Sequence, residues 1–318
     1  MIINSQKRSF GRGAKVSLFT LGTMRATESL EKMYSIIKNA YYVGINHIET
    51  APSYGDAESL IGNSIKKLAI EENIKEKNWV ITSKVLPKGD FDFLKNNFKK
   101  SLKNLNREKI NNLAIHGLNL KQHLDWVLAG EGKKFISWIL EKELVDQVGF
   151  SSHGSYSLIK DAINCEVFTF CSLHLHYLDQ SKIALAEEAI KKGMGVLAIS
   201  PADKGGRLYS PSDILIEASK PFHPLELAYR FLLAKGITTL SLGATNKKDF
   251  EFAHKLRNSF EKLTKLEKSA LNKIEEVSNE RLNSTKCEQC RSCLPCPNEV
   301  PIPEILRLRN ISIGYGQL

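Results

Sequence analysis

Four polar side chains that can move protons lie at or just after the ends of short apolar segments. Glu49 ends GINHIE and Tyr54 follows five residues later, while Lys84 ends ITSK and His116 ends LAIH. A tyrosine with a pKa of about 10 is a weak acid near neutral pH. A lysine ammonium against the phenol oxygen lowers that pKa, a carboxylate orients the lysine, and a histidine polarises a carbonyl by hydrogen bonding. The order indicates proton transfer to a carbonyl oxygen.

These side chains must be positioned by a repeated strand and helix rhythm. Helical spacing of Leu30, Met33, Ile36 and Ile37 is one example of the pattern. Strands are expected at 15–22, 45–48, 79–84, 112–116, 145–150, 167–175, 195–200 and 238–242, each followed by a helix, at 29–42, 57–68, 91–105, 135–143, 156–163, 182–192, 224–234 and 247–256.

Eight such pairs predict an α/β fold, a (β/α)8 TIM barrel, in which the carboxyl ends of the strands meet at one face. A further helix is expected at 261–280, before a small cysteine-rich segment. We therefore predict a barrel domain over residues 1–260 and a C-terminal region over residues 261–318.

The order acid, tyrosine, lysine, histidine on the second, third and fourth strands resembles the aldo-keto reductases. The resemblance implies hydride transfer between NADPH and a carbonyl or alcohol, with Tyr54 as the acid, Lys84 tuning it and His116 positioning the carbonyl. Glu49 stands where the family usually has aspartate. HIETAPSYG is closer to a bacterial branch that carries a cysteine cluster after the barrel.

The resemblance also implies a cofactor site. VGFSSHG places Ser151 and Ser152 where a Ser-Asn pair holds the nicotinamide carboxamide, and AISPADKGG matches at Ser200 but has Ile199 in place of a stacking ring. Lys204 could meet a phosphate, and a lysine after strand eight could meet a 2'-phosphate as a point charge. NADH remains an alternative to NADPH. The candidates after strand eight are Gly243, Thr245, Asn246 and Lys247.

Four of the six cysteines are packed into ten residues with the spacing C-x2-C-x2-C-x2-C-P. The spacing resembles that of bacterial ferredoxins, one residue shorter before the last cysteine, and predicts a 4Fe-4S cluster. Zinc is the alternative, although structural zinc usually takes two separated pairs of cysteines. The predicted ligands are Cys287, Cys290, Cys293 and Cys296.

Other histidines have both a structural and a functional interpretation. His174 and His176 alternate with leucines on one expected strand, so both are predicted to share a face, as core residues or as contacts of cofactor or substrate. His47 carries the same ambiguity, and His153 lies beside the expected carboxamide site.

Composition narrows the class of protein further. The chain has 318 residues, a net charge of +10 spread over many segments, and no apolar run as long as a membrane span. We expect a cytoplasmic protein, because the N-terminus is too polar for a signal peptide and clustered cysteines favour metal over disulfides. Neither nucleic acid nor membrane is expected as a partner.

The sequence therefore predicts an NAD(P)H-dependent oxidoreductase that acts on a small carbonyl or alcohol, with a one-electron carrier protein as an open further partner. One alternative is a non-catalytic module that binds NADPH and senses redox state. Another is a lyase or isomerase that uses Lys84 as a Schiff-base amine.

Overall fold

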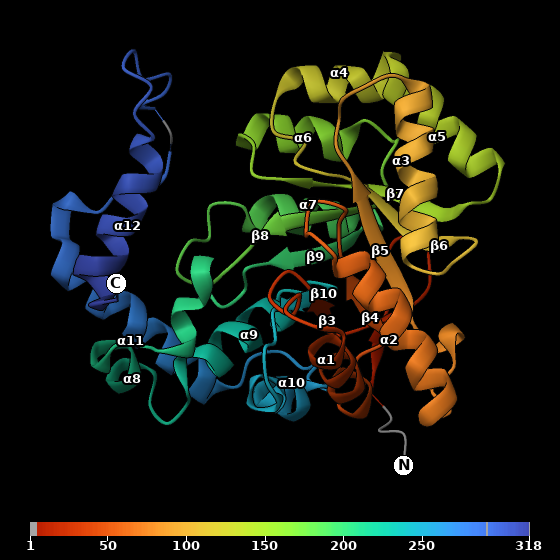
Figure 1. The fold of residues 1–318 in the computed structure, drawn as a ribbon. Coiled ribbons are helices and arrows are strands. Elements are labelled where there is room, and N and C mark those ends of the chain that lie inside the picture. The colour runs from red at the N-terminus through yellow and green to blue at the C-terminus, as the bar shows by residue number, and fades with distance from the viewer. Residues whose placement is uncertain (1–4, 291, 318) are drawn as a thin grey trace. The chain divides into compact units, whose positions relative to one another are not determined.

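Eight parallel strands pair edge to edge into a closed barrel in the computed structural model, which describes residues 5–290 and 292–317 (Figure 1). The order around the barrel is β10-β3-β4-β5-β6-β7-β8-β9, so neighbours in sequence are neighbours in space. The predicted (β/α)8 TIM barrel is confirmed. Its strands are β3 (Phe19–Gly22), β4 (His47–Glu49), β5 (Val80–Val85), β6 (Ile110–Ile115), β7 (Val145–Ser152), β8 (Phe170–His174), β9 (Gly195–Ile199) and β10 (Thr239–Leu242).

Helices follow the strands along the chain. The first begins after Ser29, whose hydroxyl accepts a hydrogen bond from the Lys32 main-chain N–H, as an N-cap residue should. The helices that follow β3 to β8 and β10 are α1 (Leu30–Tyr42), α2 (Ala57–Glu71), α3 (Phe91–Asn104), α4 (Lys121–Ala129), α5 (Glu131–Glu141), α6 (Tyr156–Asn164), α7 (Ile183–Lys191) and α10 (Glu251–Leu256).

Within residues 5–260, two α-helices were not expected from the sequence. The segment after β6 contains α4 as well as α5, and the segment after β9 contains α8 (Asp213–Ser219) before α9 (Pro224–Ala234). Both α4 and α8 are short, with nine and seven residues. A helix of two turns shows too little apolar periodicity to be separated from a loop by pattern alone.

The chain divides into two compact units, and the barrel strands all belong to the first. The second comprises residues 175–184, 200–236 and 259–318. It contains α8, α9, α11 (Lys265–Leu282) and α12 (Ile302–Tyr315). Within it, Arg230 on α9 forms a buried ion pair with Glu267 on α11 at 2.6 Å. The boundary predicted near residue 260 stays a prediction.

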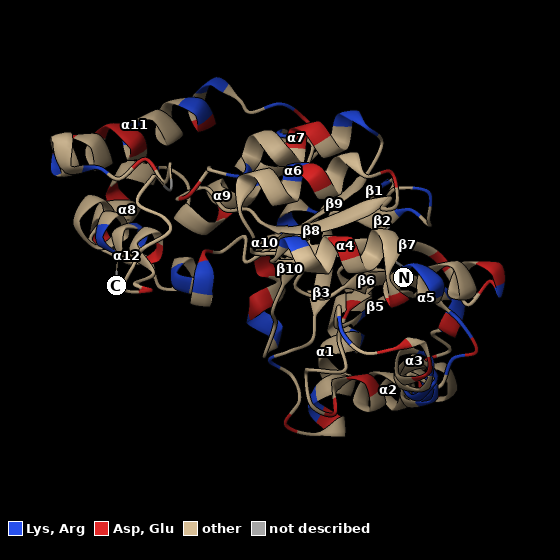
Figure 2. Ribbon diagram, turned by 90° about the horizontal axis from the view of Figure 1, so that it is seen from above, with Lys and Arg blue, Asp and Glu red and all other residues tan. Residues whose placement is uncertain are grey.

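Charged side chains of both signs occur along the helices. Figure 2 shows Lys and Arg together with Asp and Glu on α5, α7 and α11. Among the described residues, no helix combines the length and apolar character that crossing a bilayer requires.

An N-terminal hairpin places Phe10 at the amino ends of the barrel strands. The hairpin is formed by β1 (Lys7–Arg8) and β2 (Val16–Ser17). Phe10 is fully buried, and its ring lies 4.9 Å from that of Phe170 and 5.3 Å from that of His47. A Cβ atom on Gly195 would lie 2.5 Å from the Phe10 ring, so only glycine allows this packing.

A layer of hydrogen-bonded polar side chains crosses the barrel interior. His47 Nδ1 lies 2.7 Å from Thr20 Oγ1 and its Nε2 lies 2.7 Å from Thr82 Oγ1. Every buried polar group of this layer therefore has a partner, which is what a dry interior requires. The layer joins, in order, Thr239, Thr20, His47, Thr82, Asn112, Gln147 and Thr169.

His47 is thus a core residue, and its position predicts how stability depends on pH. Complete burial, and secondarily the charge of Lys84, lower its pKa from 6.5 to about 3. The unfolded chain binds a proton below pH 6.5 that the folded chain does not, so stability is full above that pH and falls below it. We expect a loss of about 2 to 3 kcal/mol from this one group between pH 6.5 and 4.5.

Urea unfolding of wild type and His47→Gln at several pH values measures this loss. The difference in stability between the two proteins should shrink by that amount as the pH falls. His254→Gln, on the exposed face of α10, serves as the control and should keep the wild-type slope. A His47→Gln slope equal to that of wild type would contradict the assignment.

Candidate active site

The Lys84 ammonium lies at the centre of the group predicted to do chemistry. Lys84 is 2% exposed and forms an ion pair with Glu49, which ends the neighbouring strand β4. Its Nζ also donates to the Thr50 carbonyl oxygen at 2.9 Å and to Tyr54 Oη at 3.0 Å. Three acceptors therefore surround a buried cation that has three N–H groups to donate.

Burial acts on the two proton-carrying groups in opposite directions. It raises the pKa of Tyr54 and lowers the pKa of Lys84 well below its ordinary value, because each charged form loses hydration. The net direction for Tyr54 is opposite to the lowering expected from Lys84 alone. Tyr54 therefore keeps its proton near neutral pH, and the ion pair with Glu49 opposes the effect of burial by favouring the charged form of Lys84.

His116 follows β6 and faces Tyr54. The two rings are edge to face, with centroids 6.0 Å apart, and the His116 main-chain N–H donates to the Val85 carbonyl at 2.7 Å. Burial, then the charges of Lys84 and His153, lower the pKa of His116 to about 4. The imidazole is neutral at physiological pH and acts as a hydrogen-bonding group.

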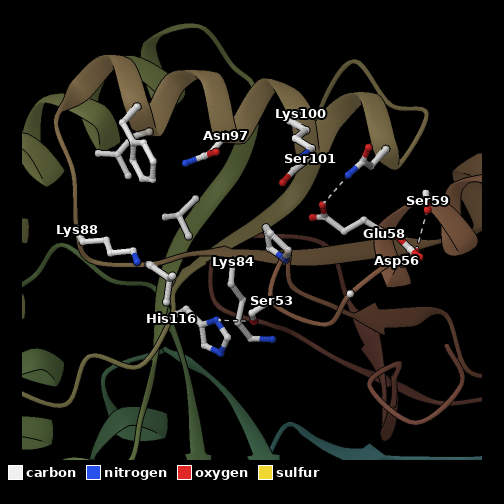
Figure 3. Close-up of a pocket in the computed structure, with 17 residues that line it drawn as sticks. Ser53, Asp56, Glu58, Ser59, Lys84, Lys88, Asn97, Lys100, Ser101 and His116 are labelled. Atoms are coloured by element: carbon white, nitrogen blue, oxygen red, sulfur yellow. Dashed lines mark hydrogen bonds between the residues drawn. The ribbon is translucent and has the colours of Figure 1, made fainter.

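A cavity of about 420 Å³ opens beside these residues (Figure 3). Lys84 and His116 line one part of it, and Glu58 of α2 lines another. Glu58 is buried and accepts hydrogen bonds from Ser83 at 2.6 Å and Asn104 at 3.5 Å, so it ties α2 to β5 and α3. The cavity therefore reaches Lys84 and His116 over a mixed polar and apolar wall, whereas Tyr54 is not among the residues that line it.

The geometry has a counterpart among known proteins. The sequence profile of the Aldo/keto reductase family matches residues 19–280, which is most of the chain and includes all four predicted catalytic positions. The chain belongs to the aldo/keto reductase family. Membership supports an oxidoreductase function.

Individual relatives are distant. The chain is 29% identical over 216 residues to an aldose reductase of Encephalitozoon cuniculi, covering 63% of this chain and 69% of that protein. It is 25% identical over 214 residues to the aldo-keto reductase str7 of Strobilurus tenacellus, covering 64% of this chain and 61% of that one.

Solved structures that resemble this chain share so few identical residues with it that they support the fold alone. An aldo-keto reductase from Bacillus halodurans in its holo form matches with a TM-score of 0.71 at 19% identity, over 85% of this chain and 96% of that one. The aldose reductase of Schistosoma japonicum matches with a TM-score of 0.66 at 19% identity, over 84% and 91% of the two chains.

The two serines predicted to contact a nicotinamide carboxamide differ in the hydrogen bonds that they make. Ser151 Oγ accepts a hydrogen bond from the Gly117 main-chain N–H at 3.0 Å. Ser152 Oγ instead donates to the Leu118 carbonyl at 2.6 Å and accepts from the Gly154 N–H at 2.9 Å, so it serves a local turn.

Ser172 is a candidate that sequence reasoning missed. It pairs in register with Ser151 across β7 and β8, and its buried hydroxyl has no hydrogen-bond partner among the described residues. A buried hydroxyl without a partner is costly, so a polar ligand there would be favourable. Its only sequence signal is a polar residue within an apolar strand.

The segment after β10 forms a capped turn. The main-chain N–H groups of Thr245 and Asn246 both donate to Asp249 Oδ2, at 2.7 and 3.0 Å. These predicted phosphate donors thus already hold a carboxylate, while the predicted lysine, Lys247, is exposed. Gly243 faces the side chain of Arg25, which lies 3.6 Å from the position of a Cβ atom.

Ser200 and Lys204 belong to the second unit. Ser200 follows β9 with a φ of 54°, and Lys204 Nζ donates to Glu304 Oε2 of α12 at 2.7 Å. The Lys204 ammonium is therefore engaged by a carboxylate of its own unit. A phosphate would have to compete with Glu304 for it.

The four C-terminal cysteines do not form a ligand set in this structure. All four are unpaired thiols, with Cys287 and Cys296 half-buried and Cys290 and Cys293 exposed. Among residues 5–290 and 292–317, no three histidine, cysteine, aspartate or glutamate side chains gather in a metal-binding arrangement. As placed, the thiols do not fit a bound cluster.

His174 and His176, which were predicted to share one face of a strand, lie in different local surroundings. The strand ends at His174, so the expectation that His176 shares a strand face with it is wrong. His176 forms an isolated bridge with Asp179 in the second unit, and its ring lies 3.5 Å from the Asp203 carboxylate. His174 instead contacts His153, with 3.3 Å between the two Nε2 atoms.

Ser53 is positioned to select the tautomer of His116. Its Oγ lies 3.4 Å from His116 Nδ1, and a hydroxyl that donates there leaves the ring proton on Nε2. We expect Ser53→Ala to convert a single tautomer into a mixture, detected as a change in the two imidazole ¹⁵N shifts of His116. Ser59→Ala is the matched control, because Ser59 Oγ donates to the Asp56 carbonyl at 2.9 Å rather than to His116. Identical shifts in all three proteins would show that Ser53 has no such role.

Proposed function

We propose that this protein is an NADPH-dependent reductase of small carbonyl compounds that also catalyses the reverse oxidation of the alcohol. The observation that carries the proposal is the position of Tyr54 Oη, 3.0 Å from a buried lysine that is ion-paired with Glu49. A buried lysine and carboxylate in contact with a half-buried tyrosine would be expensive to maintain without a chemical task.

Tyr54 is the proton donor. Because burial raises its pKa, its hydroxyl is protonated when the substrate binds. The Lys84 ammonium then stabilises the phenolate that remains once the proton has moved to the substrate oxygen. Glu49 keeps Lys84 charged throughout and holds it against Tyr54.

His116 orients the carbonyl. Its neutral ring presents a nitrogen beside Tyr54, and a hydrogen bond from that nitrogen would hold the substrate oxygen near the phenol. The proposed cofactor supplies the hydride. Ser151 and Ser172 would hold its carboxamide, which replaces the predicted Ser152, while Gly243, Thr245, Asn246, Lys247, Ser200 and Lys204 remain the proposed contacts of its phosphates.

Substitution of Tyr54 or Lys84 should affect the rate of hydride transfer but not the affinity for NADPH. We expect Tyr54→Phe and Lys84→Met to slow hydride transfer by at least about 100-fold, because general acid catalysis is lost. NADPH binding, followed by the change in nucleotide fluorescence, should stay within a few-fold of wild type. Single-turnover oxidation of bound NADPH by a panel of aldehydes gives the rate.

Tyr42→Phe and Lys121→Met are the matched controls, since both side chains are exposed on helices of the barrel unit. Full activity of either active-site variant would refute the assigned acid. Tight NADPH binding by wild type without turnover of any aldehyde would favour a non-catalytic sensor.

The iron-sulfur cluster is the part of the proposal that rests on sequence spacing alone. We propose that Cys287, Cys290, Cys293 and Cys296 hold a 4Fe-4S cluster after rearrangement of their segment, with a one-electron carrier as partner. A cytoplasmic location is proposed with it, because clustered reduced thiols suit that compartment.

Metal analysis of protein purified without oxygen tests the cluster. We expect about four iron atoms per chain and broad absorption near about 400 nm, both lost when Cys290 and Cys293 are changed to serine. Cys171→Ser, at a buried thiol of the barrel, is the control. Colourless wild-type protein with a single zinc ion would contradict the cluster.

A further inference from the structure

Two histidines meet at the carboxyl ends of adjacent barrel strands. His153 directly follows β7, and His174 is the last residue of β8. The strands pair in register up to Ser152 and Leu173, so the backbone brings the next residues opposite one another. The imidazole Nε2 atoms lie 3.3 Å apart, with ring centroids at 4.1 Å and planes inclined by 48°.

We propose that His153 and His174 form a binding site for a divalent transition-metal ion, zinc above all, and that the bound ion inhibits the enzyme. Imidazole nitrogen is a preferred ligand of Zn²⁺, Cu²⁺ and Ni²⁺. Two nitrogens bound to one tetrahedral zinc ion at 2.0–2.1 Å lie about 3.3 Å apart. The observed separation of the nitrogens therefore suits an ion held by both rings, provided that the rings swing apart until both nitrogen lone pairs point at the ion.

The main chain that carries the pair is held in place before any ion binds. The His153 main-chain N–H donates to Asn119 Oδ1 at 2.7 Å, and His174 is fixed by its ladder to β9. Preorganised ligands bind more tightly, because less freedom is lost on binding. Within the described part of the chain no third ligating side chain joins them, so water or substrate would complete the coordination.

The site lies within electrostatic reach of the proposed chemistry. The segment that follows His116 is bonded to the end of β7, because the Gly117 main-chain N–H donates to Ser151 Oγ at 3.0 Å and the His153 main-chain N–H donates to Asn119 Oδ1 at 2.7 Å. A divalent ion on His153 and His174 would add charge beside His116 and occupy space above the barrel. Both effects oppose approach of the substrate carbonyl to Tyr54.

Zinc binding is tested by calorimetry on the full-length chain with the four C-terminal cysteines changed to serine, which removes competing thiolates. We expect one zinc ion per chain, with affinity at least about ten-fold weaker in His153→Gln and in His174→Gln. His254→Gln is the control and should bind as its parent does. Affinity should also fall below about pH 6, because protons compete for imidazole.

If the chain with the four cysteines changed to serine does not fold, His153→Gln and His174→Gln are made in the wild-type chain instead. Each variant must then bind one zinc ion fewer than the wild-type protein. Equal stoichiometry and affinity in parent and variants would show that the contact is only a hydrogen bond between imidazoles. Inhibition of aldehyde reduction by zinc should likewise weaken at least about ten-fold in both variants. Calorimetry needs no turnover, so an inactive protein would overturn the proposed function and leave this test intact.

Discussion

The ion pair between Lys84 and Glu49 is the interaction on which the rest of the site depends. Two charges taken out of water cost several kcal/mol each, and their attraction offsets this only with good geometry and further hydrogen bonds. The structure supplies both, since Lys84 also donates to the Thr50 carbonyl and to Tyr54. In the barrel interior, His47 of the polar layer bonds Thr20 and Thr82 and does not compete for the hydrogen bonds of Lys84.

The same burial that costs stability creates the chemistry. It keeps the proton on Tyr54 and lowers the pKa of Lys84, while the ion pair with Glu49 favours the charged form of Lys84. Glutamate is one methylene longer than the aspartate usual in such enzymes, yet its carboxylate forms the ion pair with Lys84 directly. The substitution is therefore compatible with an intact acid.

Sequence patterns anticipated the parts of the site that strand ends determine. The sequence was enough to predict that Glu49, Lys84 and His116 lie close together, because parallel strands present their carboxyl ends at one face of a barrel. Contacts that depend on the direction of a side chain could not be predicted in this way. The Ser152 hydroxyl donates to the Leu118 carbonyl within a local turn, and Asp249 accepts hydrogen bonds from the main-chain N–H groups of Thr245 and Asn246. Nothing in the apolar spacing distinguishes these outcomes from the predicted ones.

The cysteine segment shows a different limit, because spacing states which ligands a cluster could use but not how the chain must turn to bring them together. Asn310 of α12 accepts from the Cys287 main-chain N–H at 3.2 Å and donates to the Cys287 carbonyl oxygen at 2.8 Å, whereas Cys290 Sγ lies 3.2 Å from Oγ of its neighbour Ser292. One end of the segment is therefore anchored. Any rearrangement that gathers the four thiols would move Cys290 and Cys293 toward Cys287, since the contacts of Cys287 would otherwise have to break.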